Sequence, residues 1–214
     1  MGSVSEPGLI TARTALAVLV ATWPRRIILS LLLLVPVVVA AGGGFARADP
    51  PPRDVEPGVA TDTGAYRVVP HTYFVSDRVD AGSLDEGTRW VGAVVEITNQ
   101  GPEPISVTFS DQTFELPDDL PLDDYVNPRE VLRADTGTRL GYAQPGVTYQ
   151  VVLLWQTTAL ADPPPELTLT MNRTEWTRWE IEAGQYTWRA TPEAYDVALP
   201  LGEPPASVLE EEDE

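Results

Sequence analysis

Two stretches of this chain alternate apolar and other residues with a period of two, and this pattern limits the possible folds more than any other feature. Residues 89–99 read RWVGAVVEITN, and their apolar face holds Val91, Ala93, Val95 and Ile97. Residues 145–156 read PGVTYQVVLLWQ, and their apolar face holds Val147, Tyr149, Val151, Leu153 and Trp155. Alternate side chains of a β-strand point to the same face of a sheet, so both stretches are predicted to be strands with a buried face.

Shorter strand patterns surround these two. The turn-forming sequence NQGPEP predicts a hairpin that joins residues 89–99 to a partner strand at residues 105–109. Residues 166–171, 186–190 and 195–201 are predicted to be later strands, and no amphipathic helix is predicted after residue 65. Strands separated by Gly and Pro turns at intervals of about 8–12 residues favour a sandwich or barrel over an α/β fold.

The segments WVGAVVEITNQGPEPISV and PGVTYQVVLLW resemble the core hairpin and a late strand of a known class of domains. These are the immunoglobulin-like extracytoplasmic domains of Gram-positive lipoproteins and anchored proteins of unknown function. The use of arginine as the only strong base, with abundant Ala, Gly, Pro and Val, is similar to actinobacterial proteins. Over residues 66–201 the resemblance implies an all-β, immunoglobulin-like antiparallel β-sandwich outside the cell. It implies no catalytic residues, and the chain lacks the cysteine of a lipoprotein signal.

An uncharged, strongly apolar run occupies residues 27–46. At a helical rise of about 1.5 Å per residue, the run would span about 30 Å, the thickness of the hydrocarbon core of a membrane. Arg13, Arg25 and Arg26 precede it, and an acidic segment follows it. The positive-inside rule then predicts a single-pass anchor with residues 1–26 in the cytoplasm and the C-terminal domain outside.

A cleaved signal peptide is the alternative interpretation of the same run. Ala46-Arg47-Ala48 fits a small-x-small cleavage site, which would release a secreted protein that begins at Asp49. A twin-arginine signal, which RRIIL resembles loosely, is a third route. The long segment before residue 27 favours an apolar run that is retained as an anchor. Under all three interpretations the C-terminal part is outside the membrane.

The remaining boundaries follow from composition. Residues 47–64 contain four prolines after Ala48 and few large apolar groups, so they are predicted to be a Pro-rich linker. Residues 65–201 are predicted to be one extracytoplasmic β-sandwich, because their number is usual for a single domain. Residues 202–214 end in a run of acidic residues and are predicted to be a disordered tail.

Charge and residue content exclude several functional classes. Thirty-one Asp and Glu residues but only ten Arg residues follow residue 48, so nucleic acid is predicted not to be a partner. The chain contains no cysteine, which excludes disulfides and thiolate metal sites. The single histidine, His71, and the absence of a G-x-S-x-G motif argue against a hydrolase and against a zinc site. We therefore predict a non-catalytic protein without a cofactor.

One acidic loop is a candidate calcium site. Carboxylate oxygens are the ligands that calcium takes, about six to eight of them. ELPDDLPLDDYVN supplies such ligands but does not match the spacing of a calcium-binding loop, so a solvated surface loop is the alternative. The four candidate metal residues are Asp118, Asp119, Asp123 and Asp124.

A cluster of aromatic residues is the candidate binding surface. The segment NRTEWTRWEIEAGQYTW contributes Trp176, Trp179, Tyr186 and Trp188. With the neighbouring Arg173 and Arg178, these rings could stack on sugars or form the centre of a protein interface. The alternative is a hairpin whose tryptophans complete the core.

These features together predict a membrane-anchored accessory protein that acts by binding. Its partner is expected to be another membrane or envelope protein. The alternatives are a secreted calcium- or carbohydrate-binding module and, after these, a hydrolase with paired carboxylates.

Overall fold

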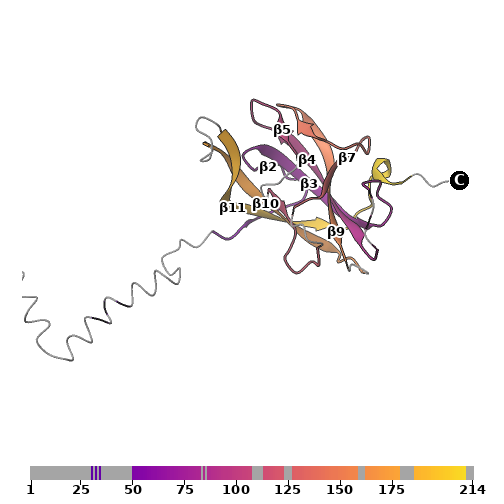
Figure 1. Ribbon diagram of the computed structural model, residues 1–214, viewed down its shortest axis with the longest axis horizontal. Coiled ribbons are helices and arrows are strands. Elements are labelled where there is room, and N and C mark those ends of the chain that lie inside the picture. The colour runs from indigo at the N-terminus through magenta and orange to yellow at the C-terminus, as the bar shows by residue number, and fades with distance from the viewer. Residues whose placement is uncertain are drawn as a thin grey trace, which may run out of the picture. The chain divides into compact units, whose positions relative to one another are not determined.

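The computed structural model divides the chain into two units, Met1–Ala48 and Asp49–Glu214, and the fold lies in the second. The structure describes residues 30, 32, 34, 50–82, 84, 86–107, 113–122, 127–158, 162–178 and 186–210. Two main sheets and one short ribbon account for the strands of the second unit (Figure 1).

The first sheet has the order β1-β11-β10-β6 and the second has the order β2-β3-β4-β9-β7, while β5 and β8 form the ribbon. The strands are β1 (Arg53–Val55), β2 (Thr61–Asp62), β3 (Tyr66–Ser76), β4 (Arg89–Asn99), β5 (Ile105–Ser106), β6 (Phe114–Glu115), β7 (Glu130–Arg133), β8 (Tyr142–Ala143), β9 (Thr148–Thr157), β10 (Glu166–Arg178) and β11 (Tyr186–Pro200). A short 3₁₀ helix, η1 (Ala206–Val208), follows β11. The described part of the second unit is therefore all-β, as predicted.

The alternating pattern of β4 and β9 builds the core between the two main sheets. The core residues of the five-stranded sheet include Val68, Tyr73, Val91, Ala93, Val95, Ile97, Val151, Leu153 and Trp155. They share one cluster with Phe114, Leu167, Leu169, Met171, Val197 and Leu199 of the four-stranded sheet. Two sheets with one common core form a β-sandwich, so the predicted fold class is confirmed at this level. The immunoglobulin-like topology stays a prediction.

The other face of the five-stranded sheet is also buried. Phe74, Trp90, Val94, Leu132, Val152 and Leu154 form a second cluster there with residues outside the strands, including Val79 and Val208. Gly92 makes room for this packing, because a Cβ at its position would lie only 2.2 Å from Cζ of Phe74. The two faces of β4 and β9 thus contribute to two different cores.

The predicted hairpin between residues 89–99 and 105–109 is wrong. β4 is antiparallel to β3 on one side and to β9 on the other, so neither of its edges is open to β5. β5 pairs instead with β8, where Ile105 lies opposite Ala143. The NQGPEP segment is therefore a crossing loop between β4 and a separate ribbon.

A bulge explains why β3 has no clean alternating pattern in the sequence. The β3–β4 register places Pro70 opposite Val95 and Thr72 opposite Val94, which leaves His71 as the inserted residue. Pro70 has no N–H to donate to a ladder, and prolines in sheets are largely confined to edges and bulges. The insertion reverses the alternation of side chains along the strand.

The folded unit extends beyond both predicted domain boundaries. β1 runs parallel to β11, and β2 pairs with β3, so parts of the expected linker at 47–64 belong to the sheets. At the other end, Val208 is fully buried and Leu209 forms a bridge with Val79, within the expected disordered tail at 202–214. Short-range composition does not reveal these contacts, because they join segments far apart in the sequence.

The predicted anchor at 27–46 lies outside the described residues, except for Ser30, Leu32 and Leu34. Each of these three residues is helical and exposed. Within the described part of the chain, no helix combines the length and the apolar character needed to cross a membrane. The anchor therefore stays a prediction.

Candidate functional site

The β10–β11 hairpin changes register part-way along its length, and its far end carries the aromatic residues. Asn172 lies opposite Ala194, but Thr174 lies opposite Ala190, so residues 191–193 of β11 form a bulge. An ion pair of 3.1 Å between Nη1 of Arg173 and Oε2 of Glu193 spans this bulge. Beyond it, residues 174–178 and 186–190 form a two-stranded segment that we call the aromatic ribbon.

Thr174 fixes the base of the aromatic ribbon to the turn between β2 and β3. Its side chain is buried, and its Oγ1 accepts a hydrogen bond of 3.1 Å from the N–H of Ala65. The same hydroxyl donates to the carbonyl of Thr63 at 3.0 Å, and the N–H of Thr174 donates to that carbonyl at 2.8 Å. Gly64 is required at this joint, because a Cβ there would lie 1.8 Å from the carbonyl oxygen of Thr174.

Three aromatic rings gather on one face of the ribbon. Trp176 and Trp188 are direct cross-strand partners, and their ring centroids are 5.3 Å apart at an interplanar angle of 57°. Tyr186 stacks on Trp176 with a centroid distance of 6.0 Å and an angle of 13°. Trp176 is 52% exposed and Tyr186 is 54% exposed, whereas Trp188 is half-buried against the main core. The cluster thus has one ring anchored in the core and two rings open to solvent.

A loop held by Asn99 faces this cluster. Asn99 is buried, and its Nδ2 donates to the carbonyls of Glu103 and Ala143, each at 2.8 Å. Its Oδ1 accepts a bond of 2.7 Å from the N–H of Gly101. The bonds to Gly101 and Glu103 thus hold the path of residues 100–104, and the bond to Ala143 ties Asn99 to β8. Gly101 approaches the cluster closely, since a Cβ there would lie 3.5 Å from Cζ2 of Trp188.

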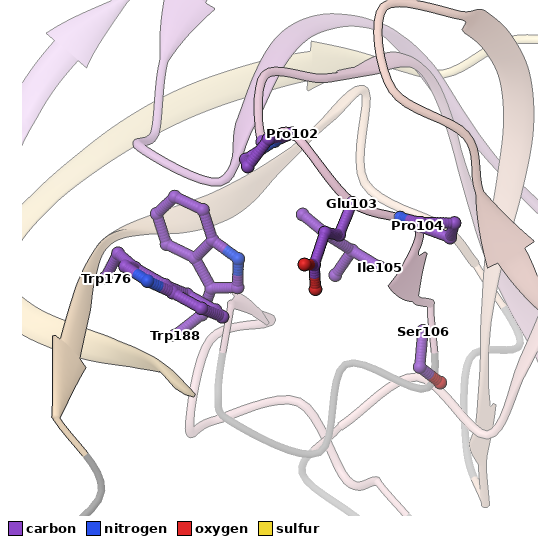
Figure 2. A pocket seen from close by; sticks show the side chains of 8 residues that line it. Pro102, Glu103, Pro104, Ile105, Ser106, Trp176 and Trp188 are labelled. Atoms are coloured by element: carbon purple, nitrogen blue, oxygen red, sulfur yellow. The ribbon is translucent and has the colours of Figure 1, made fainter. Parts of the chain in front are cut away.

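A hollow of about 300 Å³ separates the loop from the tryptophans. Its lining consists of Gly101, Pro102, Glu103, Pro104, Ile105, Ser106, Trp176 and Trp188. Figure 2 shows the Glu103 carboxylate turned into the hollow, toward the two indole rings, with Ile105 beside it. Apart from Glu103 and Ser106 the named side chains are apolar or aromatic, so one carboxylate supplies the charge of the described lining.

The predicted aromatic site is partly brought together. Trp176, Tyr186 and Trp188 form one cluster, whereas Trp179 lies outside the described residues. Among the three described rings, the core alternative fits Trp188, because Trp176 and Tyr186 are more than half exposed. The sequence predicts a hairpin turn and its return strand over residues 102–106, so the part these residues play in the hollow is not predicted. The only sequence signal for them was the Pro-Glu-Pro segment itself.

The candidate calcium loop is described only in part. Asp118 and Asp119 are exposed in a turn closed by a bond of 3.0 Å from the N–H of Leu120 to the carbonyl of Pro117, while Asp123 and Asp124 lie outside the described residues. No group of three or more His, Asp or Glu residues within the described ranges is arranged to hold a metal ion. Burial raises the pKa of nearby Glu115, and the charge of Asp118 adds to this effect, although a hydrogen bond from Asn172 opposes it.

His71 is engaged with a neighbouring strand. Its Nε2 lies 3.3 Å from Oε1 of Glu96 on β4, and both side chains are partly exposed. This contact joins the bulge of β3 to the neighbouring strand β4. The structure therefore places the single histidine of the chain in the sheet and outside the lining of the aromatic hollow.

Comparisons with known proteins give little further information. No family model and no curated protein matches the sequence. Among solved structures, the chain is similar to an uncharacterized β-sandwich protein from Clostridium difficile 630, with 12% identity and a TM-score of 0.43. That match covers 71% of this chain and 97% of the other. The two main sheets and their shared core establish the β-sandwich.

Proposed function

We propose that this chain is a non-catalytic binding module that is held at the outer surface of a membrane by residues 27–46. Its β-sandwich would belong to the immunoglobulin-like extracytoplasmic class, and it would act as an accessory protein of a membrane or envelope assembly. The aromatic ribbon and the facing loop are the surface that would contact the partner. Another membrane or envelope protein is the partner that we favour.

The observation that carries this proposal is the exposure of Trp176 and Tyr186. A single exposed aromatic residue needs no explanation, but two stacked rings beside a half-buried third form a continuous apolar patch. Aromatic residues dominate the centres of protein interfaces, because they bury a large area with few rotatable bonds. The anchoring of Trp188 and the bonds of Asn99 hold this patch in place before any partner arrives.

A pull-down from detergent-solubilised membranes tests the binding surface. Full-length protein carrying Trp176→Ala and Tyr186→Ala together is expected to lose the partner that the unaltered protein retains, because both exposed rings are removed. Tyr142→Ala is the matched control, since Tyr142 is 62% exposed but does not line the hollow. Mass spectrometry of the captured proteins gives the readout. Equal capture by the double variant and by the unaltered protein would contradict the proposal.

The proposed topology makes a separate prediction. If residues 27–46 are retained as an anchor, a C-terminal tag is accessible to protease in spheroplasts, and the full-length mass stays in the membrane fraction. The arginine flank at Arg25 and Arg26 is the reason to expect this orientation. A soluble protein whose N-terminus is Asp49 would instead establish cleavage after Ala48.

A carbohydrate ligand is the second candidate, and the open indole of Trp176 favours it. Sugar rings stack on exposed aromatic faces, and Trp176 is 52% exposed. Cell-wall polysaccharide is the probe for this class. Retention of the unaltered protein on that polysaccharide, with loss for the Trp176→Ala and Tyr186→Ala double variant, would favour a sugar over a protein partner.

A further inference from the structure

The hollow beside the aromatic ribbon combines aromatic faces with one negative charge, and this combination is specific for a class of ligand. Indole rings carry negative charge on their faces and attract cations more strongly than other aromatic side chains do. The indole planes of Trp176 and Trp188 make an angle of 57° with each other, so the two rings bound the hollow from two directions. The Glu103 carboxylate is turned into the same space (Figure 2).

Glu103 is available to a ligand. Among the interactions resolved for the described residues, its backbone carbonyl accepts a bond from Asn99, while its carboxylate forms no salt bridge. The bond from Asn99 fixes the position of the residue and leaves the side chain exposed. A positioned carboxylate next to aromatic faces can bind a cation without a large rearrangement.

We propose that this hollow binds the guanidinium group of an arginine side chain on the partner protein. A guanidinium is planar, so it can stack on an indole face while its N–H groups donate two parallel bonds to a carboxylate. The hollow offers both kinds of contact at once. A quaternary ammonium could use the rings, but it has no N–H to donate to Glu103.

The charge of the whole domain supports the same occupant. After residue 48 the chain has thirty-one acidic residues and ten arginines, so its field attracts cations and repels anions. An arginine-bearing segment would therefore be steered toward the domain before the specific contacts form. An acidic or phosphorylated partner would be repelled by the same field.

Titration of the full-length chain with N-acetyl-arginine amide tests the inference directly. The indole N–H resonances of ¹⁵N-tryptophan-labelled protein report binding at Trp176 and Trp188. A polyoxyethylene detergent and phosphate buffer should be used, because glycosidic detergents, amine oxides and Tris could compete for the hollow. We expect a dissociation constant on the order of millimolar, since one side chain makes few contacts.

Two comparisons decide whether charge recognition is involved. The citrulline analogue has nearly the same shape as the arginine probe but no charge, and we expect it to bind at least about tenfold more weakly. Glu103→Gln should weaken binding of the arginine probe by about the same factor. Glu175→Gln, which removes the same charge from the ribbon but does not line the hollow, should leave binding unchanged.

Equal binding of the arginine and citrulline probes would overturn the inference, as would equal affinities of Glu103→Gln and the unaltered protein. Tetramethylammonium that bound more tightly than the arginine probe would also overturn it, in favour of a quaternary ammonium ligand.

This inference rests on the proposed function of the aromatic ribbon, and the two can fail separately. In the pull-down, one outcome is that Glu103→Gln captures the partner as well as the unaltered protein does, while the Trp176→Ala and Tyr186→Ala double variant loses it. That result would support the binding module but contradict the arginine contact. A partner retained by all of these variants would contradict the proposed function itself.

Discussion

Trp155→Ala is expected to unfold the β-sandwich or to destabilise it severely. Trp155 is 1% exposed, lies opposite Val91 in the β4–β9 ladder and belongs to the core shared by the two sheets. Removing a buried tryptophan side chain costs about 3–5 kcal/mol, because the cavity that remains is only partly filled. That loss is a large part of the roughly 5–15 kcal/mol by which a domain is stable.

Trp176→Ala provides the matched comparison, since it removes the same side chain from an exposed position. Trp176 is 52% exposed and loses mainly its ring contacts with Tyr186 and Trp188. Such aromatic contacts contribute about 0.5–1.5 kcal/mol each, so the free energy of unfolding should fall much less than in Trp155→Ala. Thermal unfolding of the full-length proteins by near-UV circular dichroism measures the difference. Equal losses would mean that the aromatic ribbon is part of the core, and its role as a binding surface should then be abandoned.

Val208→Asp is expected to cause the second large loss of stability, because it places a charge in the buried cluster where the C-terminal segment packs on the five-stranded sheet. Val208 is fully buried in the second core, and its carbonyl accepts a bond of 2.9 Å from the N–H of Asp80. A carboxylate without a partner in such a site should lower the free energy of unfolding by at least about 3 kcal/mol. Burial raises the pKa of a carboxyl, so the loss should become smaller at acid pH, where the group is neutral.

Ala206→Asp is the control for this substitution, since it adds the same charge two residues earlier at an exposed position. Urea denaturation followed by tryptophan fluorescence should show almost no change for Ala206→Asp and a clear loss for Val208→Asp. If Val208→Asp were as stable as the unaltered protein, the C-terminal segment would not cover the sheet in solution, and residues 202–214 would be a tail as first predicted.

The strongest strands could be predicted from local sequence because their buried faces follow the geometry of a single strand. β4 was predicted with its observed bounds, and its four alternate apolar residues all face the main core. In the apolar face predicted for residues 145–156, Val151, Leu153 and Trp155 are in the main core, and Tyr149 packs against it. Val147 precedes β9 and is 43% exposed. Burial decreases only at the N-terminal end of β9, and the alternating pattern alone does not show where burial ends.

The pairing of the strands could not be predicted in the same way. A Gly-Pro turn favours a hairpin wherever the adjacent strand has a free edge, but β3 and β9 occupy both edges of β4. β3 itself was missed, because the bulge at His71 interrupts its alternation. Both errors arise from long-range pairing, which overrides a local turn preference.

The aromatic residues of the candidate site show the same difference between local sequence patterns and long-range packing. The sequence leaves open whether Trp176 lies at the surface or in the core, and the structure shows that it is 52% exposed. The partial burial of Trp188 depends on its packing against the main core. The hollow needs, in addition, a loop about eighty residues earlier in the chain, which the bonds of Asn99 to Gly101 and Glu103 hold in place. No local pattern indicates that Glu103 faces these rings.

The sequence by itself determined that the domain is all-β, that β4 and β9 are central to it, and that Trp155 is buried. These properties depend on the period of the side chains along one strand, which is local information. Only the tertiary structure decided which strands pair, where β1 and the C-terminal segment attach, and how the Asn99 loop meets the aromatic ribbon. These features depend on contacts between residues that are far apart in the chain, and such contacts are selected by the packing of the whole domain.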